Sequence, residues 1–272
     1  MSDQTCLRRH LLHAAVETYH PDGPLYSGAP ARWTGSPPAR IDAPGIDFAL
    51  VGRFAEGIVA AFRGTLPPLD LSPDGRRILP PGLAAVPRIV ADWGNDANAI
   101  PRRGIEVAGE ILPGRVHAGF AGSLVRLWDG VAAAIDRLRG PDPAPRLYFT
   151  GHSKGGALAN LAAVRARRAW PGATIKAVTF GAPRAGDADF ARAYAAAAVD
   201  GQRYEVEGDI VAGVPRSGVP VGAPHGVALV AALRLPSAAL HGLFRPIEAH
   251  LPYRGFGYDR HVYETGAAPE WF

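Results

Sequence analysis

A serine flanked by glycines carries the clearest chemical signal in this sequence. Ser153 is the centre of the run Gly151-His-Ser-Lys-Gly155, which has the form G-x-S-x-G. A serine hydroxyl is a weak nucleophile, so it reacts with an acyl group only where a sharp turn exposes it and a base stands beside it. Such a turn brings backbone atoms into close contact, which requires small residues two before and two after the serine. The run therefore indicates a nucleophile elbow. A structural tight turn or a phosphate-binding turn is the alternative.

The segments around Ser153 favour the elbow. Residues 146–150 read Arg-Leu-Tyr-Phe-Thr, typical of a short buried strand, and residues 157–164 are rich in alanine and leucine, typical of a helix. Strand, turn and helix in this order are the context that a nucleophile elbow requires. The dinucleotide fingerprint and the P-loop, which also use glycine-rich turns, are not present in the sequence.

A catalytic serine needs a histidine base and a carboxylate that orients the imidazole, and in this arrangement the chain order is serine, acid, histidine. The acids downstream of Ser153 include Asp187, Asp189, Asp200, Glu205, Glu207 and Asp209. Asp209 follows the expected strand at residues 203–206, which is where a triad acid belongs. Asp187 and Asp189 open an expected helix, where the helix dipole alone accounts for acidic residues. Asp209 is therefore the predicted acid.

The base is harder to choose from the residues alone. The later histidines are His225, His241, His250 and His261. A histidine is more often a surface or core residue than a catalyst, and periodicity does not separate these four. The residues alone leave all four histidines as candidates for the base.

The elements that must position these residues alternate between strand and helix. Strands are expected at residues 48–51, 58–62, 105–111, 146–150, 175–180 and 203–206. Helices are expected at residues 7–18, 120–138, 157–170 and 187–198. This alternation predicts one α/β domain over residues 1–272 with a largely parallel sheet. Two proline-rich stretches, 66–90 and 215–224, interrupt the pattern and are expected to be loops.

Composition excludes several other classes. The 272 residues are 47% hydrophobic, enough for a sizeable core, and no apolar run is long enough to span a bilayer. Cys6 is the only cysteine, which rules out an intrachain disulfide and a thiolate metal cluster. The net charge is +4, but the basic residues are scattered without a stripe or an aromatic motif, so no nucleic-acid partner is expected.

The first ten residues contain an early acid and no apolar stretch before a cleavage site. No signal peptide is therefore recognised. The expectation is a cytoplasmic protein, with export by an unconventional route as the alternative.

Several further motifs occur in a characteristic order. They are Ala61-Phe-Arg-Gly-Thr65, Asp92-Trp93, Val116-His-Ala-Gly-Phe120, Thr150-Gly-His-Ser-Lys-Gly-Gly156, Thr179-Phe-Gly-Ala-Pro-Arg184 and Gly208-Asp-Ile-Val211. With this set the chain resembles the class 3 lipases, a family of fungal-type triacylglycerol lipases. The resemblance spans roughly residues 48–263. It implies the α/β-hydrolase fold, with a mostly parallel central sheet and helices on both faces.

The resemblance also implies roles for individual residues. Ser153 is the nucleophile, Asp209 the acid and His261 the base, with spacings of 56 and 52 residues along the chain. His250 is the reserve for the base. The backbone N–H groups of Thr65 and Lys154 form the oxyanion hole. His117 and His152, although they lie within matching motifs, are interpreted as structural.

The implied reaction is hydrolysis of carboxylic esters of lipids through an acyl-enzyme. The triad supplies both nucleophile and base, so neither a metal nor an organic cofactor is expected. The expected partner is a lipid or another hydrophobic ester, with transient contact to a lipid interface. A phospholipase A1 or an acyltransferase on the same fold, or a non-catalytic lipid-binding protein, is the alternative.

Two departures from the family pattern stand out. Lys154 replaces a leucine that is common in fungal members, and this lysine resembles bacterial relatives. Its ammonium is expected either to attract an anionic group, or to point to solvent or pair locally. The stretch at about 66–90 lies where the family has its lid, but its six prolines disfavour a simple amphipathic helix there.

Overall fold

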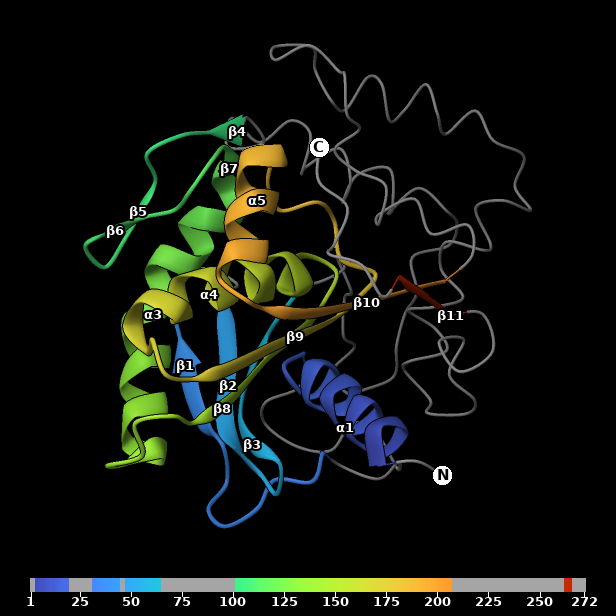
Figure 1. Cartoon of the computed structure of the whole chain (residues 1–272). Coiled ribbons are helices and arrows are strands. Elements are labelled where there is room, and N and C mark those ends of the chain that lie inside the picture. The colour runs from blue at the N-terminus through green and yellow to red at the C-terminus, as the bar shows by residue number, and fades with distance from the viewer. Residues whose placement is uncertain (1–2, 20–30, 45–46, 65–100, 207–261, 266–272) are drawn as a thin grey trace, which may run out of the picture.

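A central sheet of parallel and antiparallel strands organises the protein (Figure 1). The computed structural model describes residues 3–19, 31–44, 47–64, 101–206 and 262–265. The sheet contains seven strands in the order β1-β2-β3-β8-β9-β10-β11. Their bounds are β1 Ala39–Asp42, β2 Phe48–Phe54, β3 Gly57–Phe62, β8 Arg146–His152, β9 Thr174–Phe180, β10 Asp200–Val206 and β11 Val262–Thr265.

The middle of the sheet is parallel. Strands β3, β8, β9 and β10 pair in parallel, whereas β1, β2 and β11 pair with their neighbours in antiparallel fashion. Five of these strands consequently point the same way, and β2 and β11 point the opposite way. Carboxyl ends of parallel strands meet at one edge of a sheet, which is where open α/β sheets place their sites. The expected mostly parallel α/β sheet is confirmed.

Strand residues alternate between two apolar layers, because successive side chains of a strand point to opposite faces. On β3, Ala60 and Phe62 belong to the larger buried cluster with helices α3 (Ala118–Arg139), α4 (Lys154–Ala169) and α5 (Ala188–Ala196). Val59 and Ala61 belong to a second cluster with helix α1 (Asp3–Glu17). Figure 1 shows α1 on one face of the sheet and the other three helices on the opposite face. Helices therefore cover both faces, as expected.

Helix boundaries follow from local chemistry. Asp187 caps α5, its carboxylate accepting hydrogen bonds from the N–H groups of Asp189 and Phe190 at 3.0 Å. His117 caps α3 in the same way, which starts that helix two residues before the expected position. Helix α4 begins at Lys154. Gly155 and Gly156 are poor helix formers, but they occupy its first turn because the sharp turn before the helix requires small residues there.

One expected strand is wrong. Residues 105–111 form a small hairpin of β5 (Glu106–Val107) and β6 (Glu110–Ile111) instead of a single strand. Ala108 and Gly109 both have positive φ, 47° and 82°, and so reverse the chain in two residues. Strands β1 and β11 and the short pair β4 (Pro101–Arg102) and β7 (Val116–His117) were not expected. The stretches 66–90 and 215–224 lie outside the described residues.

Candidate active site

The turn at Ser153 joins strand β8 to helix α4. Ser153 has φ 55° and ψ −131°, a conformation that residues with a side chain rarely adopt. Two backbone hydrogen bonds of 2.9 Å hold it: its N–H donates to the carbonyl oxygen of Phe180, and its carbonyl oxygen accepts from the N–H of Gly156. The Ser153 hydroxyl makes no capping hydrogen bond to α4. The strained serine thus stands at the carboxyl end of a central strand, as the elbow prediction requires.

The glycines of the elbow are needed for contact with backbone atoms. A Cβ atom on Gly151 would lie 2.3 Å from the carbonyl carbon of Gly155, and one on Gly155 would lie 2.1 Å from the carbonyl oxygen of Phe62. Both distances are far shorter than any van der Waals contact. On Gly156, a Cβ would lie 2.6 Å from the Cβ of Ala182. The small residues therefore allow strand β3, the turn and helix α4 to pack together.

Of the two expected oxyanion donors, the structure describes Lys154. It is the first residue of α4, and the first N–H groups of a helix have no acceptor within the helix. Thr65 lies outside the described residues. Its neighbour Gly64 packs against the elbow, because a Cβ on Gly64 would lie 2.6 Å from the carbonyl oxygen of His152. The chain that leads to Thr65 therefore passes directly beside the turn that carries Ser153.

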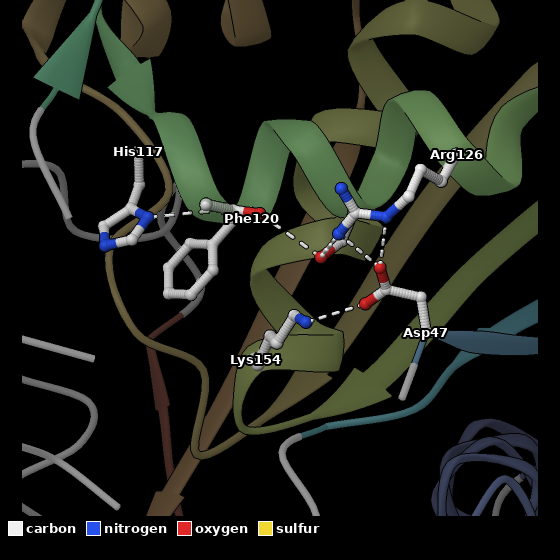
Figure 2. A network of polar contacts seen from close by, with 7 residues as sticks. Asp47, His117, Phe120, Arg126 and Lys154 are labelled. Atoms are coloured by element: carbon white, nitrogen blue, oxygen red, sulfur yellow. Dashed lines mark hydrogen bonds and ion pairs between the residues drawn. The ribbon is translucent and has the colours of Figure 1, made fainter. Parts of the chain in front are cut away.

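The side chain of Lys154 pairs locally. Its Nζ lies 2.8 Å from Oδ1 of Asp47, and Nε of Arg126 donates to Oδ2 of the same carboxylate at 2.8 Å (Figure 2). The side chains of Asp47 and Lys154 are only 3% and 12% exposed, whereas that of Arg126 is 45% exposed. Of the two expectations for this lysine, local pairing is therefore the one observed.

The partners of Asp47 stabilise its charged form in spite of its burial. Burial alone raises the pKa of a carboxyl group, because it disfavours the charged form. The hydrogen bond and the charge of Lys154, with hydrogen bonds from Arg126 and Ser123, outweigh this effect and lower the pKa of Asp47 below its ordinary value. The cluster beside the first turn of α4 therefore contains one negative and two positive groups, of which Asp47 and Lys154 are largely buried.

His152, the residue directly before the serine, has a structural role. Its Nδ1 lies 3.0 Å from the hydroxyl oxygen of Tyr19, which follows helix α1. Burial lowers the pKa of His152 to about 4, so the ring is neutral near pH 7. This contact links the elbow to the N-terminal helix on the other face of the sheet. The prediction that His152 is structural agrees with this arrangement.

His117 is structural as well. Its ring Nδ1 accepts a hydrogen bond from the N–H of Phe120 at 3.4 Å, and the two rings stack with centroids 3.9 Å apart (Figure 2). The N–H of His117 donates to the carbonyl oxygen of Ala185 at 3.0 Å. Cap, ring stack and backbone bond all serve to fix the start of α3.

The remaining expected site residues lie outside the described part of the chain. These are Asp209, His261, His250 and Thr65. The strands next to two of them are described: β10 ends at Val206, β11 begins at Val262, and these two residues are paired. The structure therefore shows Ser153 and Lys154 together and describes the strand ends that flank Asp209 and His261.

Sequence reasoning did not find Asp47 or Arg126. Asp47 meets Lys154 across 107 positions of sequence and Arg126 across 79, so no local spacing relates them. Asp47 lies one residue before an expected strand. Arg126 lies on an expected helix, where a charged residue is common and does not indicate a function. Only the packing of α3 against α4 and of β2 against β3 brings them together.

Within the described ranges, no three histidine, cysteine, aspartate or glutamate side chains are grouped to hold a metal ion. None of the helices in the same ranges combines the length and the apolarity that a membrane crossing requires.

A match to a known protein family covers the strand and the helix that form the elbow. Residues 59–218, more than half of the chain, match the family described as lipase (class 3). The chain belongs to the class 3 lipase family. Ser153 and Lys154 both lie in the matching span, as do Thr65 and Asp209, whereas His261 lies beyond it.

One curated relative of this class 3 lipase family member is also named a lipase. The chain is 38% identical over 106 residues to Lipase ZK262.3 of Caenorhabditis elegans, an overlap of 38% of this chain and 29% of that relative. The chain thus spans less than a third of the length of this curated relative.

Solved fungal lipases share the fold. Rhizomucor miehei triacylglyceride lipase is 21% identical, with a TM-score of 0.56 over 80% of this chain and 76% of the other. Penicillium expansum triacylglycerol lipase is 19% identical, with a TM-score of 0.57 over 79% and 74%. At these identities the likeness concerns the α/β-hydrolase fold.

Proposed function

We propose that this member of the class 3 lipase family is a serine hydrolase that cleaves carboxylic ester bonds of lipids. The observation that carries the proposal is the strained elbow, in which Ser153 has φ 55° between strand β8 and helix α4. The chain that contains this elbow belongs to the class 3 lipase family. Strained backbone persists only where its surroundings enforce it, and it is concentrated at functional sites. Solved structures that share the fold and are named as triacylglycerol lipases support a lipid ester as the substrate class.

The proposed reaction is acyl transfer to water. Ser153 Oγ attacks the ester carbonyl while His261 accepts its proton, and Asp209 orients and stabilises the imidazolium. The N–H groups of Thr65 and Lys154 stabilise the oxyanion of the tetrahedral intermediate, each donor contributing about 3 kcal/mol to lowering the barrier. His261 then protonates the departing alcohol. Water, deprotonated by the same histidine, hydrolyses the acyl-enzyme and restores Ser153.

Strand connectivity supports His261 and Asp209 as partners of Ser153. Asp209 follows Val206 by three residues and His261 directly precedes Val262, and these two valines pair at the ends of β10 and β11. Successive Cα atoms are about 3.8 Å apart, so chain connectivity limits the Cα of Asp209 to within about 11 Å of the Val206 Cα, and that of His261 to about 4 Å from the Val262 Cα. The reserve base, His250, is twelve residues before Val262 and has no such constraint.

The same edge of the sheet carries the serine. His152, Phe180 and Tyr204 are register partners across β8, β9 and β10. Ser153 follows the first of these residues, and Val206 lies two positions after the last. Neighbouring strands are about 4.8 Å apart, so β10 ends roughly 10 Å from the elbow.

Hydrolysis of p-nitrophenyl esters from acetate to palmitate, with and without a detergent or lipid interface, tests the proposal. Wild-type protein is expected to turn over these esters, and Ser153→Ala is expected to be inactive. Preference for long chains would identify a lipase, and preference for short chains an esterase. Folded wild-type protein that hydrolyses none of them would contradict the proposal and favour lipid binding without catalysis.

A further inference from the structure

The ion cluster beside Ser153 joins three separate elements to one carboxylate. Asp47 directly precedes β2, Arg126 lies on α3, and Lys154 is the first residue of α4 (Figure 2). Lys154 Nζ and Arg126 Nε each lie 2.8 Å from an oxygen of Asp47, one on each side of the carboxylate. The backbone next to Asp47 is held too, because its carbonyl oxygen accepts a hydrogen bond from the N–H of Ala43 at 3.1 Å.

A lysine at this position needs a specific partner. The N-terminus of a helix carries a partial positive charge, so an ammonium group there is unfavourable. The side chain of Lys154 is also largely removed from water, at 12% exposure, which adds a desolvation penalty. Asp47 offsets both effects. Without it, the ammonium would have to leave the cluster for solvent.

The ammonium and the expected oxyanion donor belong to one residue. The Lys154 N–H directly follows Ser153, whose φ of 55° is strained and must be enforced by its neighbours. On one side the elbow is fixed by the bond from Ser153 N–H to Phe180. On the other side, Lys154 is fixed through its side chain to the start of β2. A small displacement of such a donor is enough to weaken transition-state stabilisation.

We propose that Asp47 is a positioning residue for catalysis, which holds Lys154 so that its backbone N–H remains aligned as an oxyanion donor. The inference rests on the proposed function, because it assigns a role in that same reaction. Asp47 itself does not touch the substrate. Its effect is transmitted through Lys154, and Arg126 keeps the carboxylate in place.

The first test compares the kinetics of wild type and Asp47→Asn with a p-nitrophenyl ester. Loss of an interaction that is made only in the transition state lowers kcat and kcat/KM equally and leaves KM unchanged. Loss of one oxyanion donor lowers kcat by about 10² to 10³, so misalignment is expected to lower it by about 10 to 100. Inhibition by octylboronic acid, which forms a tetrahedral adduct with the serine, is expected to weaken by a similar factor.

A double-mutant cycle separates positioning from a merely structural role. Lys154→Met keeps the backbone N–H and removes the ammonium, while Asp47 stays paired with Arg126. If Asp47 acts through Lys154, the substitution Asp47→Asn lowers kcat much less in the Lys154→Met background than in wild type. Equal losses in both backgrounds would overturn the inference, because Asp47 would then act independently of Lys154.

The chain's other lysine offers a control ion pair, in which the aspartate side chain is 61% exposed. Lys176 and Asp200 form an ion pair of 3.0 Å, and Asp200 begins β10 at the edge of the sheet opposite the elbow. Asp200→Asn is expected to leave kcat unchanged. If Asp47→Asn does not fold, Asp47→Glu replaces it in the cycle, since it keeps the charge and changes its distance from Lys154.

The outcomes distinguish this inference from the function on which it rests. A wild type that hydrolyses esters, together with an Asp47→Asn variant of unchanged kcat and unchanged boronate inhibition, overturns the positioning role alone. A folded wild type with no ester hydrolysis and no boronate binding overturns the proposed function, and the positioning role with it.

Discussion

Gly155 and Phe62 are in such close contact that a Cβ atom on Gly155 would lie 2.1 Å from the carbonyl oxygen of Phe62. The two residues belong to neighbouring elements, the first turn of α4 and the end of β3. Their approach explains why the second glycine of the G-x-S-x-G run is needed. It also links the serine turn to the strand whose continuation leads to Thr65.

This contact predicts that Gly155→Ala disrupts the elbow. Because the clash is with backbone, it cannot be relieved by a side-chain rotation, and we expect the free energy of unfolding to fall by more than about 2 kcal/mol. Ester hydrolysis should be largely lost. Urea denaturation and p-nitrophenyl ester turnover measure the two effects.

Gly122 provides the control for that substitution. It lies within α3, and the nearest atom to an added Cβ would be Nη1 of Arg126, 3.6 Å away. Gly122→Ala is therefore expected to stabilise the protein by about 0.5 to 1 kcal/mol, as alanine does within helices. A Gly155→Ala variant as stable and as active as wild type would contradict the close contact.

Burial of neutral His152 should make the protein less stable in mild acid. Burial lowers its pKa from 6.5 to about 4, so between these values the unfolded chain binds a proton that folded His152 does not. The free energy of unfolding is therefore unaffected by this group above pH 6.5. It falls as the pH drops from 6.5 toward 4, by about 3 kcal/mol in all.

The measurement for His152 is urea unfolding at several pH values between 4 and 7.5, for wild type and His152→Asn. Asparagine does not titrate and can still accept a hydrogen bond from Tyr19. Other groups, including His10, contribute to the pH dependence of both proteins, so the difference between the two curves is the relevant quantity. Parallel curves would show that His152 does not carry the effect.

Adjacent residues on α3 should differ sharply in their contribution to stability. Leu124 is fully buried in the larger core cluster, whereas Val125 is 42% exposed. Leu124→Ala is expected to reduce the free energy of unfolding by about 2 to 5 kcal/mol, since it leaves a cavity. Val125→Ala should change it by less than about 0.5 kcal/mol. Similar losses in both variants would mean that α3 packs in another orientation.

The strand pairing predicts which histidine is the base. His261 is tethered directly to Val262, which pairs with Val206 at the end of β10. His261→Ala should therefore lower kcat by about 10³-fold or more, and His250→Ala should leave it near the wild-type value. Steady-state kinetics with p-nitrophenyl butyrate measure both. Loss of activity in His250→Ala alone would show that the base is assigned to the wrong residue.

The features found from sequence are those that depend on local pattern. The elbow was predictable because glycine spacing, an apolar strand and an alanine-rich helix lie within a few residues of Ser153. The start of α4 at Lys154 was missed, because Gly155 and Gly156 oppose a helix by propensity and are placed there by packing against Phe62 and Ala182. Propensity gave way to a tertiary requirement.

The errors elsewhere have the same origin. Residues 105–111 read as one strand because isoleucine and valine favour extended backbone, but the positive φ angles of Ala108 and Gly109 reverse the chain. Asp47 was not recognised, because its partner Lys154 is far away in sequence and meets it only in the folded protein. Long-range ion pairs of this kind have no signature in a single sequence.

The most direct test of the central claim, that Ser153 is the nucleophile of an ester hydrolase, is covalent labelling. The folded protein would be treated with an alkyl fluorophosphonate, which phosphonylates activated serines, and the site would be mapped by peptide mass spectrometry. A single adduct is expected on Ser153, formed in parallel with loss of ester hydrolysis, and none in Ser153→Ala. An active protein that remains unlabelled at Ser153, or is labelled at another serine as its activity disappears, would contradict the account.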